Sequence, residues 1–372
     1  MSVQPLRLGI VGTRGNGAKL LADAVPLVPD LLTIAATCDV AQDAKFEGRC
    51  AQWQCRGFRD IDTMLAQAGS DIDILHVATP SGMHLEPILA GLKAGKHVLS
   101  DKPLDVTVAR MRLALGAAQE SAGRLFVVSQ NRWLPGMQLA AAALKKQRLS
   151  KLCRITVISP WNRGDDYYHG SWRGKWATDG GAAMINQTIH PVDLATNFAA
   201  LALGVERNWD MIELLGGVIL QVAHQPEVLE ADDVSHMHFK LSGGAEVDVV
   251  AMTAAKPERK WTIAVEGWDD DGFIVDADGR LLRWEFNQPG DEDAEARKLG
   301  PIASASTGGA SDPLGVGSAA HAEMLRALIP AIWNDRPFEL EGAQGAFAGL
   351  LIRQFYENAR DPMGLRPDNF KA

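Results

Sequence analysis

The chain carries a lysine in a context that suits proton transfer. Lys102 lies in the sequence Asp101-Lys102-Pro103, directly after a short apolar run, His97–Ser100. An ammonium group that leaves the end of a buried strand, partly shielded from water, can share a proton near neutral pH. The proline that follows permits a cis peptide, which fixes the direction of the chain. The alternative is an ordinary surface lysine before a turn proline.

A histidine far along the chain is the second candidate. Asn186 and His190 are one helical turn apart, so on a helix their side chains share a face. Asp193 adjoins that face and could orient the imidazole, whose unperturbed pKa of ~6.5 suits a proton acceptor. A lone histidine on a helix is usually structural. Here a pair of glycines, Gly180 and Gly181, leads into the segment, and this context favours a functional histidine.

A glycine-rich turn follows the first apolar run of the chain. It consists of Gly12, Thr13, Arg14, Gly15, Asn16 and Gly17. Glycines let backbone amides and a helix N-terminus approach a pyrophosphate closely. Gly12 and Gly17 match the first and third glycines of the GxGxxG fingerprint, whereas Arg14 occupies the middle position. The turn predicts a dinucleotide site through an imperfect match.

An aspartate at the end of the second apolar run supports this prediction. Asp39 lies roughly 20 residues after Gly17, where a carboxylate is expected to accept hydrogen bonds from ribose hydroxyls. A carboxylate there repels a 2′-phosphate, so the sequence favours NAD over NADP. Arg14 is a counter-argument, because a guanidinium can pair with a 2′-phosphate. The alternative for Asp39 is a helix N-cap.

A third strand end is a candidate for the cofactor side of the site. The stretch from Thr79 and Pro80 to His84 follows a buried run, Ile72–Ala78. Ligands of open α/β sheets bind at the carboxyl ends of strands. His84 alternatively begins the next helix.

Apolar patterning predicts the elements that position these residues. Between residues 1 and 130, nearly continuous apolar runs alternate with amphipathic stretches, as in parallel sheets that helices cover on both faces. Strands are expected at Leu6–Val11, Leu31–Cys38, Ile72–Ala78, His97–Ser100 and Leu125–Ser129, and helices at Ala18–Val28, Ala41–Gln54, Ile61–Ala68, Leu85–Ala94 and Val106–Ser121.

Residues 131–372 show a different pattern, in which apolar and polar residues alternate. This period is typical of antiparallel sheets with one buried face. Strands are expected at Cys153–Ser159, Val234–Leu241, Glu246–Thr253, Trp261–Gly267 and Leu281–Phe286, and helices at Pro135–Lys146, Ala319–Asn334 and Gly342–Asn358. Residues 287–317 are expected to form a long surface excursion. The fold class is α/β, with an N-terminal dinucleotide-binding domain and a C-terminal α+β domain; the last helix could pack back on the first domain.

Composition excludes several function classes. The 372 residues carry a net charge of -9, which disfavours nucleic acid as a partner. No apolar run approaches the ~20 residues of a membrane span. The cysteines, Cys38, Cys50, Cys55 and Cys153, show no zinc-ligand spacing, so we expect no metal site and a cytoplasmic protein with reduced thiols.

In their order along the chain, these motifs resemble the Gfo/Idh/MocA family of sugar and polyol oxidoreductases. The resemblance implies a Rossmann domain followed by a domain with a large open, mostly antiparallel sheet, often used for oligomerisation, so we expect a homodimer or homotetramer. Lys102 would match the family's catalytic lysine and His190 its catalytic histidine. Asn186 falls where many members carry aspartate, which leaves His190 as the proton acceptor. The segment from Tyr167-Tyr168 to Trp172-Arg173-Gly174, followed by Asn186-Gln187, is most similar to members that oxidise the 3-hydroxyl of UDP-N-acetylglucosamine uronate and related pyranosides.

Motifs and resemblance together assign two sets of ligand-binding residues. NAD is expected against Gly12, Thr13, Arg14, Gly15, Asn16, Gly17, Asp39, Thr79, Pro80, His84, Asp101, Lys102, Gln130, Trp172 and Arg173. The carbohydrate is expected against Lys102, Asn131, Arg132, Tyr168, Trp172, Asn186, Gln187, His190 and Asp193. Two alternatives stay open. One is a non-catalytic dinucleotide-binding sensor or scaffold, and the other is an enzyme that recycles a tightly bound cofactor between two sugars.

Overall fold

The computed structural model describes residues 4–299, 317–367 and 370. Its internal contacts divide the chain into two compact units. The first contains residues 1–130 and 316–349, and the second contains residues 131–315 and 350–372. It stays a prediction that residues 1–130 bind the cofactor and that residues 131–372 bind the substrate.

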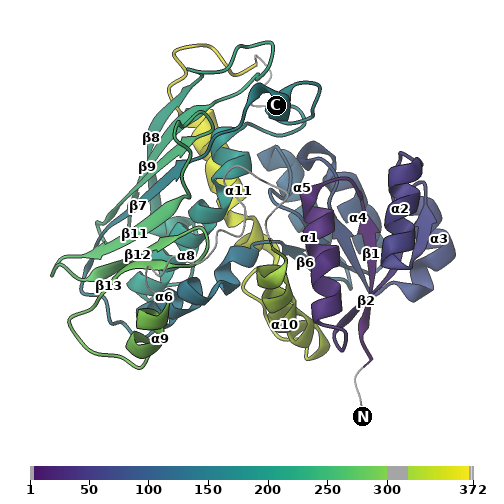
Figure 1. Cartoon of the computed structure of the whole chain (residues 1–372), viewed down its shortest axis with the longest axis horizontal. Coiled ribbons are helices and arrows are strands. Elements are labelled where there is room, and N and C mark those ends of the chain that lie inside the picture. The colour runs from purple at the N-terminus through teal and green to yellow at the C-terminus, as the bar shows by residue number, and fades with distance from the viewer. Residues whose placement is uncertain (1–3, 300–316, 368–369, 371–372) are drawn as a thin grey trace. The chain divides into compact units, whose positions relative to one another are not determined.

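The first unit contains a six-stranded parallel sheet (Figure 1). Its strands are β1 (Leu6–Val11), β2 (Leu32–Cys38), β3 (Arg56–Phe58), β4 (Ile74–Val77), β5 (His97–Ser100) and β6 (Leu125–Val127). The strand order is β3-β2-β1-β4-β5-β6, so the direction of winding reverses between β1 and β4. The carboxyl ends of the two strands at such a reversal are where doubly wound sheets bind ligands.

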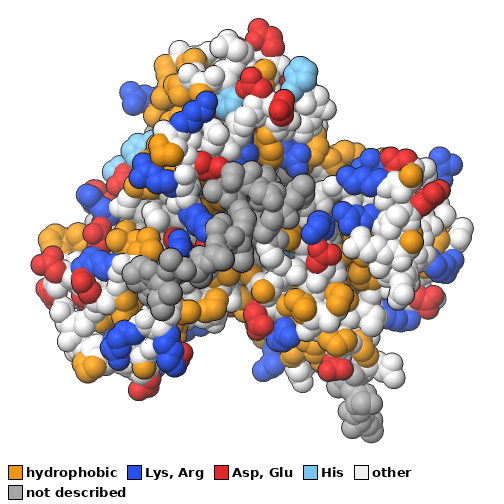
Figure 2. All heavy atoms as spheres, in the orientation of Figure 1, with side chains coloured by type: hydrophobic (Ala, Val, Ile, Leu, Met, Phe, Trp, Pro, Cys, Tyr) orange, Lys and Arg blue, Asp and Glu red, His pale blue; other side chains and the backbone are white. Residues whose placement is uncertain are grey.

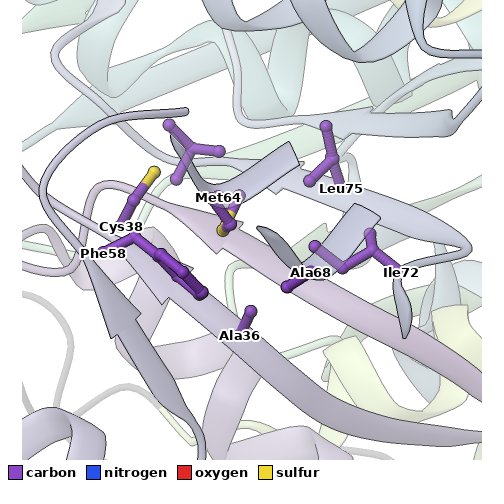
Figure 3. Packing of buried hydrophobic residues seen from close by; sticks show 8 residues of the cluster. Ala36, Cys38, Phe58, Met64, Ala68, Ile72 and Leu75 are labelled. Atoms are coloured by element: carbon purple, nitrogen blue, oxygen red, sulfur yellow. The ribbon is translucent and has the colours of Figure 1, made fainter. Parts of the chain in front are cut away.

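Helices cover this sheet because the amphipathic stretches between strands bury one face each. They are α1 (Asn16–Ala24), α2 (Ala44–Trp53), α3 (Ile61–Ala68), α4 (Leu85–Lys93), α5 (Val108–Glu120) and α10 (Ala319–Trp333). α3 contacts α4 and α4 contacts α5, whereas α1 contacts α10. Figure 3 shows part of the core, where Met64 and Ala68 of α3 pack with Cys38 and Phe58.

The second unit contains a seven-stranded sheet of order β13-β12-β11-β7-β10-β9-β8 (Figure 1). Its strands are β7 (Leu152–Pro160), β8 (Ile212–Leu220), β9 (Val234–Leu241), β10 (Glu246–Met252), β11 (Thr262–Gly267), β12 (Gly272–Asp276) and β13 (Leu281–Glu285). Among the named strands of this sheet, within the described residues, β7 and β10 are the one parallel pair. Buried and less buried residues alternate along β9, β10 and β11, which confirms the predicted one-sided sheet and, with the first unit, the predicted fold class.

The second unit adds α6 (Pro135–Lys145), α7 (Asp165–Tyr168), α8 (Ile189–Leu203) and α9 (Glu292–Lys298), and α11 (Gly342–Asn358) passes from the first unit into the second. α8 contacts β7 and β11, and its Phe198 meets Phe273 of β12 edge to face with ring centroids 5.3 Å apart. The helix therefore covers the buried face of the sheet.

Some expected elements need correction. The sequence patterns missed β3, β8 and β12, and α9 lies in the stretch expected to be an irregular excursion. The sequence pattern did not predict β8 because Gly216 and Gly217 interrupt its apolar run, next to a register shift in its pairing with β9. Residues 300–316 of that excursion lie outside the described residues. Within 4–299 and 317–367, no helix is both long and apolar enough to cross a bilayer.

Candidate active site

The glycine-rich turn lies at the reversal point of the first sheet. Gly12 follows β1 and has a φ of 86°, a left-handed conformation that glycine adopts at low cost. A Cβ at this position would lie 2.9 Å from both the Ala78 carbonyl oxygen and the Thr79 amide nitrogen. The turn therefore packs directly against the segment after β4, as the predicted cofactor role of both stretches requires.

The helix that follows this turn has an N-terminus suited to an anion. In the described structure α1 has Gly15 as its N-cap without a side-chain hydrogen bond, and its first turn contains no acidic residue. The first amides of a helix lack partners within the helix and, with the helix dipole, favour a phosphate group. Gly17 packs so tightly against the Asp101 carboxylate that a larger residue could not be accommodated without a shift. The residues present fit a pyrophosphate.

Asp39 is close to the turn but is engaged by the protein. Its Oδ2 accepts hydrogen bonds from the amide of Thr13 at 2.9 Å and from the Thr13 hydroxyl at 2.8 Å. Its Oδ1 accepts from the amide of Ala41 at 3.1 Å and lies 3.7 Å from Nε of Arg14. These contacts hold a carboxylate at the end of β2. The N-cap alternative applies to Asp43 instead, which caps α2.

His84 links the segment after β4 to the segment after β5. It is 1% exposed, and its ring nitrogens lie 2.9 Å from the Pro103 carbonyl oxygen and 2.8 Å from the Thr79 carbonyl oxygen. The Lys102–Pro103 peptide is cis. The histidine therefore helps to position Lys102 through the backbone; any direct contact with a cofactor stays a prediction.

Asp101 belongs to a largely buried polar cluster that the sequence did not reveal. Burial opposes ionisation of its carboxyl group, but attraction and a 3.0 Å hydrogen bond to His76 outweigh it and lower the pKa of Asp101. His321 of α10 also attracts this carboxylate, and burial lowers the pKa of His321 to about 4. Both histidines are at most 2% exposed. An ionised Asp101 is thus held beside Lys102.

The second unit places Asn186 and His190 differently from the sequence expectation. Asn186 lies in a π-helical turn, Ala183–Gln187, whereas His190 lies in the first turn of α8. One regular helix therefore does not carry both residues. The amide nitrogen of Asn186 lies 2.6 Å and 2.8 Å from the two carboxylate oxygens of Asp179, which is 1% exposed.

A second buried carboxylate fixes the π-helical turn. Asp232 accepts hydrogen bonds from the amides of Ala182 and Met184 at 3.0 and 3.2 Å and from the hydroxyl of Tyr356 at 2.8 Å. The hydroxyl of Ser235 donates to the same carboxylate. Burial raises the pKa of Asp232 despite these bonds. The sequence analysis missed Asp179 and Asp232; the signals available were an aspartate next to Gly180-Gly181 and an acidic pair, Asp232-Asp233, directly before the expected strand Val234–Leu241.

Asp193 has arginine partners, and its expected role of orienting His190 stays a prediction. Arg132 Nε and Nη2 donate to its two carboxylate oxygens at 2.7 and 2.6 Å, and Arg207 Nη1 donates at 2.7 Å. All three side chains are at most 5% exposed. These hydrogen bonds give the Asp193 carboxylate a structural role. Contact of Arg132 or Asp193 with a substrate stays a prediction.

Aromatic and basic side chains gather near Gln187. The amide nitrogen of Gln187 donates to the Tyr167 hydroxyl at 2.9 Å, and Arg163 donates to its amide oxygen at 3.0 Å. The guanidinium of Arg173 lies 4.8 Å from the ring centroid of Tyr167 and 5.0 Å from that of Trp172. This arrangement suits a ring-shaped polar ligand. Tyr168, also expected here, is 2% exposed.

Gln130 and Asn131 lie in a 3₁₀ turn, Gln130–Trp133, at the division between the two units. Their expected contacts with cofactor and substrate stay predictions. Among the residues described, no group of three or more His, Cys, Asp or Glu could hold a metal ion.

Two family models match the chain. Residues 6–129 match "Oxidoreductase family, NAD-binding Rossmann fold", and residues 137–269 match "GFO/IDH/MocA C-terminal domain". A dTDP-3,4-didehydro-2,6-dideoxy-alpha-D-glucose 3-reductase of Saccharopolyspora spinosa is 30% identical over 282 residues, which is 70% of this chain and 79% of the relative. The chain belongs to the Gfo/Idh/MocA family.

Two further proteins show how far this family likeness extends. An inositol 2-dehydrogenase of Rhizobium meliloti is 27% identical over 192 residues, 51% of this chain and 54% of the relative, so the match spans about half of its length. The crystal structure of the WlbA dehydrogenase from Bordetella pertussis, in complex with NADH and UDP-GlcNAcA, is 26% identical with a TM-score of 0.82 and 96% of each chain covered.

The Gfo/Idh/MocA models include the predicted catalytic residues. The N-terminal model covers Lys102, and the C-terminal model covers Asn186 and His190.

A surface hollow of about 710 Å³ lies elsewhere on the second unit, lined in part by Trp284, Phe286 and Arg297. It contains no residue of the predicted site. Figure 2 shows acidic and basic side chains interspersed over the visible face of the molecule.

Proposed function

We propose that this Gfo/Idh/MocA member is an NAD-dependent oxidoreductase. It transfers hydride between the nicotinamide and a secondary alcohol of a sugar, glycoside or polyol, and the pyranose 3-hydroxyl is the proposed position. One observation carries the proposal: the turn from Gly12 leads into an N-terminus of α1 without a side-chain cap in the described structure, beside the strand-end Asp39. The named activities of the relatives support the substrate class, because they include a sugar 3-reductase and an inositol dehydrogenase.

The chemistry divides between the two units. A bound nicotinamide supplies the hydride acceptor when the alcohol is oxidised. His190 would take the hydroxyl proton, and Lys102 would hydrogen-bond the same oxygen and stabilise its developing charge. Asn186, oriented by Asp179, would hold that oxygen or the lysine without carrying a proton.

The carbohydrate is proposed to bind beside the aromatic group of the second unit. Trp172 offers a flat apolar face to a sugar ring, and the stacked Arg173 offers hydrogen-bond donors at its edge. Because Arg132 donates hydrogen bonds to the Asp193 carboxylate, we expect the two residues to support the wall of the site.

The cellular setting is part of the same proposal. We expect the protein to act in the cytoplasm, without a nucleic-acid or membrane partner, as a homodimer or homotetramer. Size-exclusion chromatography with light scattering would measure the subunit number directly.

A substrate panel tests the proposed activity. Free sugars, inositols, glycosides and nucleotide sugars are incubated with the full chain and either NAD or NADP, and absorbance at 340 nm is followed. Turnover with one carbohydrate class and loss of that turnover in Lys102→Ala would support the proposal. Dinucleotide binding without turnover across the panel would favour a sensor, and reduced cofactor that stays bound through purification would favour a sugar–sugar oxidoreductase.

A further inference from the structure

The arginine in the glycine-rich turn lies between two carboxylates. Arg14 Nη2 is 2.7 Å from Oδ2 of Asp43, and its Nε is 3.7 Å from Oδ1 of Asp39. The hydrogen bond between Arg14 and Asp43 raises the pKa of Arg14 and lowers the pKa of Asp43. The Arg14 and Asp43 side chains are 40% and 54% exposed. The positive charge of Arg14 is therefore balanced by neighbouring carboxylates, but its guanidinium is still accessible to a ligand.

Asp39 alone does not determine the charge at this place. Three hydrogen bonds from Thr13 and Ala41 engage its oxygens, and its side chain is only 8% exposed. Arg14 and Asp43 both contribute exposed charges near the end of β2. A phosphate group arriving here would meet one cation already paired with an anion.

We infer that Asp43 is a cofactor-specificity residue, which favours NAD over NADP by pairing with Arg14. The pairing keeps the guanidinium from a 2′-phosphate, and the Asp43 carboxylate also repels that phosphate. This inference rests on the proposed binding of a dinucleotide at the turn, and it assigns a role to a residue outside the glycine-rich motif.

The size of the effect follows from the exposure of the pair. Exposed ion pairs are weak, so the pair opposes a competing phosphate only modestly. Removal of Asp43 frees a guanidinium that forms charge-assisted hydrogen bonds with phosphate and also removes a like charge. We expect NADP binding to tighten by roughly tenfold relative to NAD binding.

The variants must remove the charge without disrupting α2. Asp43 is the N-cap of this helix and accepts a hydrogen bond from the Phe46 amide at 3.1 Å. Serine and asparagine are good N-caps, so Asp43→Ser and Asp43→Asn keep the cap. Asp60→Ser is the matched control, because Asp60 caps α3 in the same unit through the Thr63 amide at 2.7 Å.

The experiment measures dissociation constants of NAD and NADP for the full chain by calorimetry at low and high salt. We expect both Asp43 variants to lower the NADP constant relative to that of NAD, and Asp60→Ser to leave the ratio unchanged. The gain should be clearly smaller in an Arg14→Ala background, where only the repulsion by Asp43 is removed, and it should shrink at high salt. If NAD binds and the ratio is unchanged, or if the gain is equally large without Arg14, the inference is rejected and the proposed function still stands. A wild-type chain that binds neither dinucleotide rejects the proposed function as well.

Discussion

The two units hold their candidate residues in different ways. In the first, the glycine-rich turn, Asp39 and Lys102 follow strand ends of a parallel sheet, so their positions depend on short stretches of nearby sequence. In the second, Asn186 lies in a π-helical turn that Asp179 and Asp232 hold through side-chain hydrogen bonds. The first arrangement is set by backbone topology, and the second by buried carboxylates, of which Asp232 comes from a distant part of the sequence.

This difference has a physical cause. Adjacent parallel strands bring their carboxyl ends to one edge, so residues after β1, β4 and β5 become neighbours without further help. A π-helical turn is rare and costly, so it needs partners that satisfy its backbone amides. The carboxylate of Asp232 accepts hydrogen bonds from two backbone amides at the start of this turn, those of Ala182 and Met184, and Asp232 is 0% exposed.

The largest expected effect comes from removing one proposed catalytic group in each unit. We expect Lys102→Ala and His190→Ala each to lower kcat by roughly 10²–10⁴, because each removes a proton-transfer or charge-stabilising group. Cofactor affinity should change little. Steady-state kinetics on the substrate found by the panel, with NAD titrations, would measure both.

Lys93→Ala is a suitable control for the lysine, because Lys93 is exposed in the last turn of α4. Near-normal turnover in either alanine variant would remove that residue from the proposed mechanism and leave the other unit to supply the chemistry.

The next largest effect tests the buried support of the second unit. Asp232→Asn replaces an acceptor-only carboxylate by an amide, which must leave some of its four donors unsatisfied. We expect a loss of about 3–4 kcal/mol in the free energy of unfolding and a lower kcat, since the π-helical turn loses its anchor. Urea denaturation would measure the loss.

Tyr356→Phe removes one of the donors to Asp232 and keeps the aromatic packing against Trp176, whose ring centroid lies 5.2 Å away. Its expected cost is about 1 kcal/mol. Equal stability of Asp232→Asn and the wild type would mean that the turn does not depend on this carboxylate.

The same contrast explains what the sequence could predict. Helix Ile61–Ala68 and strand Val234–Leu241 were predicted with the bounds that the structure has, because periodicity alone determines them. The pairing of Asp193 with Arg132 and Arg207, and the role of Asp232, could not be predicted. Such contacts depend on which distant side chains meet in the folded chain, and no local pattern encodes that.

A pH experiment separates two buried histidines of opposite character. Burial lowers the pKa of His321 in the first unit from 6.5 to about 4. Its neutral form stabilises the fold above pH 6.5, and that contribution, up to about 3 kcal/mol, is lost as the pH falls toward 4. In the second unit, the hydrogen bond to Asp233 raises the pKa of His224, so its contribution is present at low pH and is lost as the pH rises.

Thermal unfolding from pH 7.5 to 4.5 would test both signs. We expect His321→Gln to flatten the loss of stability on acidification, and His224→Gln to reduce stability more at pH 5.5 than at pH 7.5. Parallel pH profiles of both variants and the wild type would contradict the assignments.

The smallest expected effect concerns Asp39. This residue is proposed to position the cofactor and takes no direct part in the proposed reaction. Asp39→Ser removes the carboxylate at the end of β2 that we propose for the ribose hydroxyls, so the preference for NAD over NADP should fall by about fivefold. Thr13→Val is the matched control. It removes the hydroxyl that donates to Asp39 at 2.8 Å and retains the carboxylate, so the preference should stay within about twofold. An equal change of the ratio in both variants would mean that the geometry of the turn, and not the charge of Asp39, sets the preference.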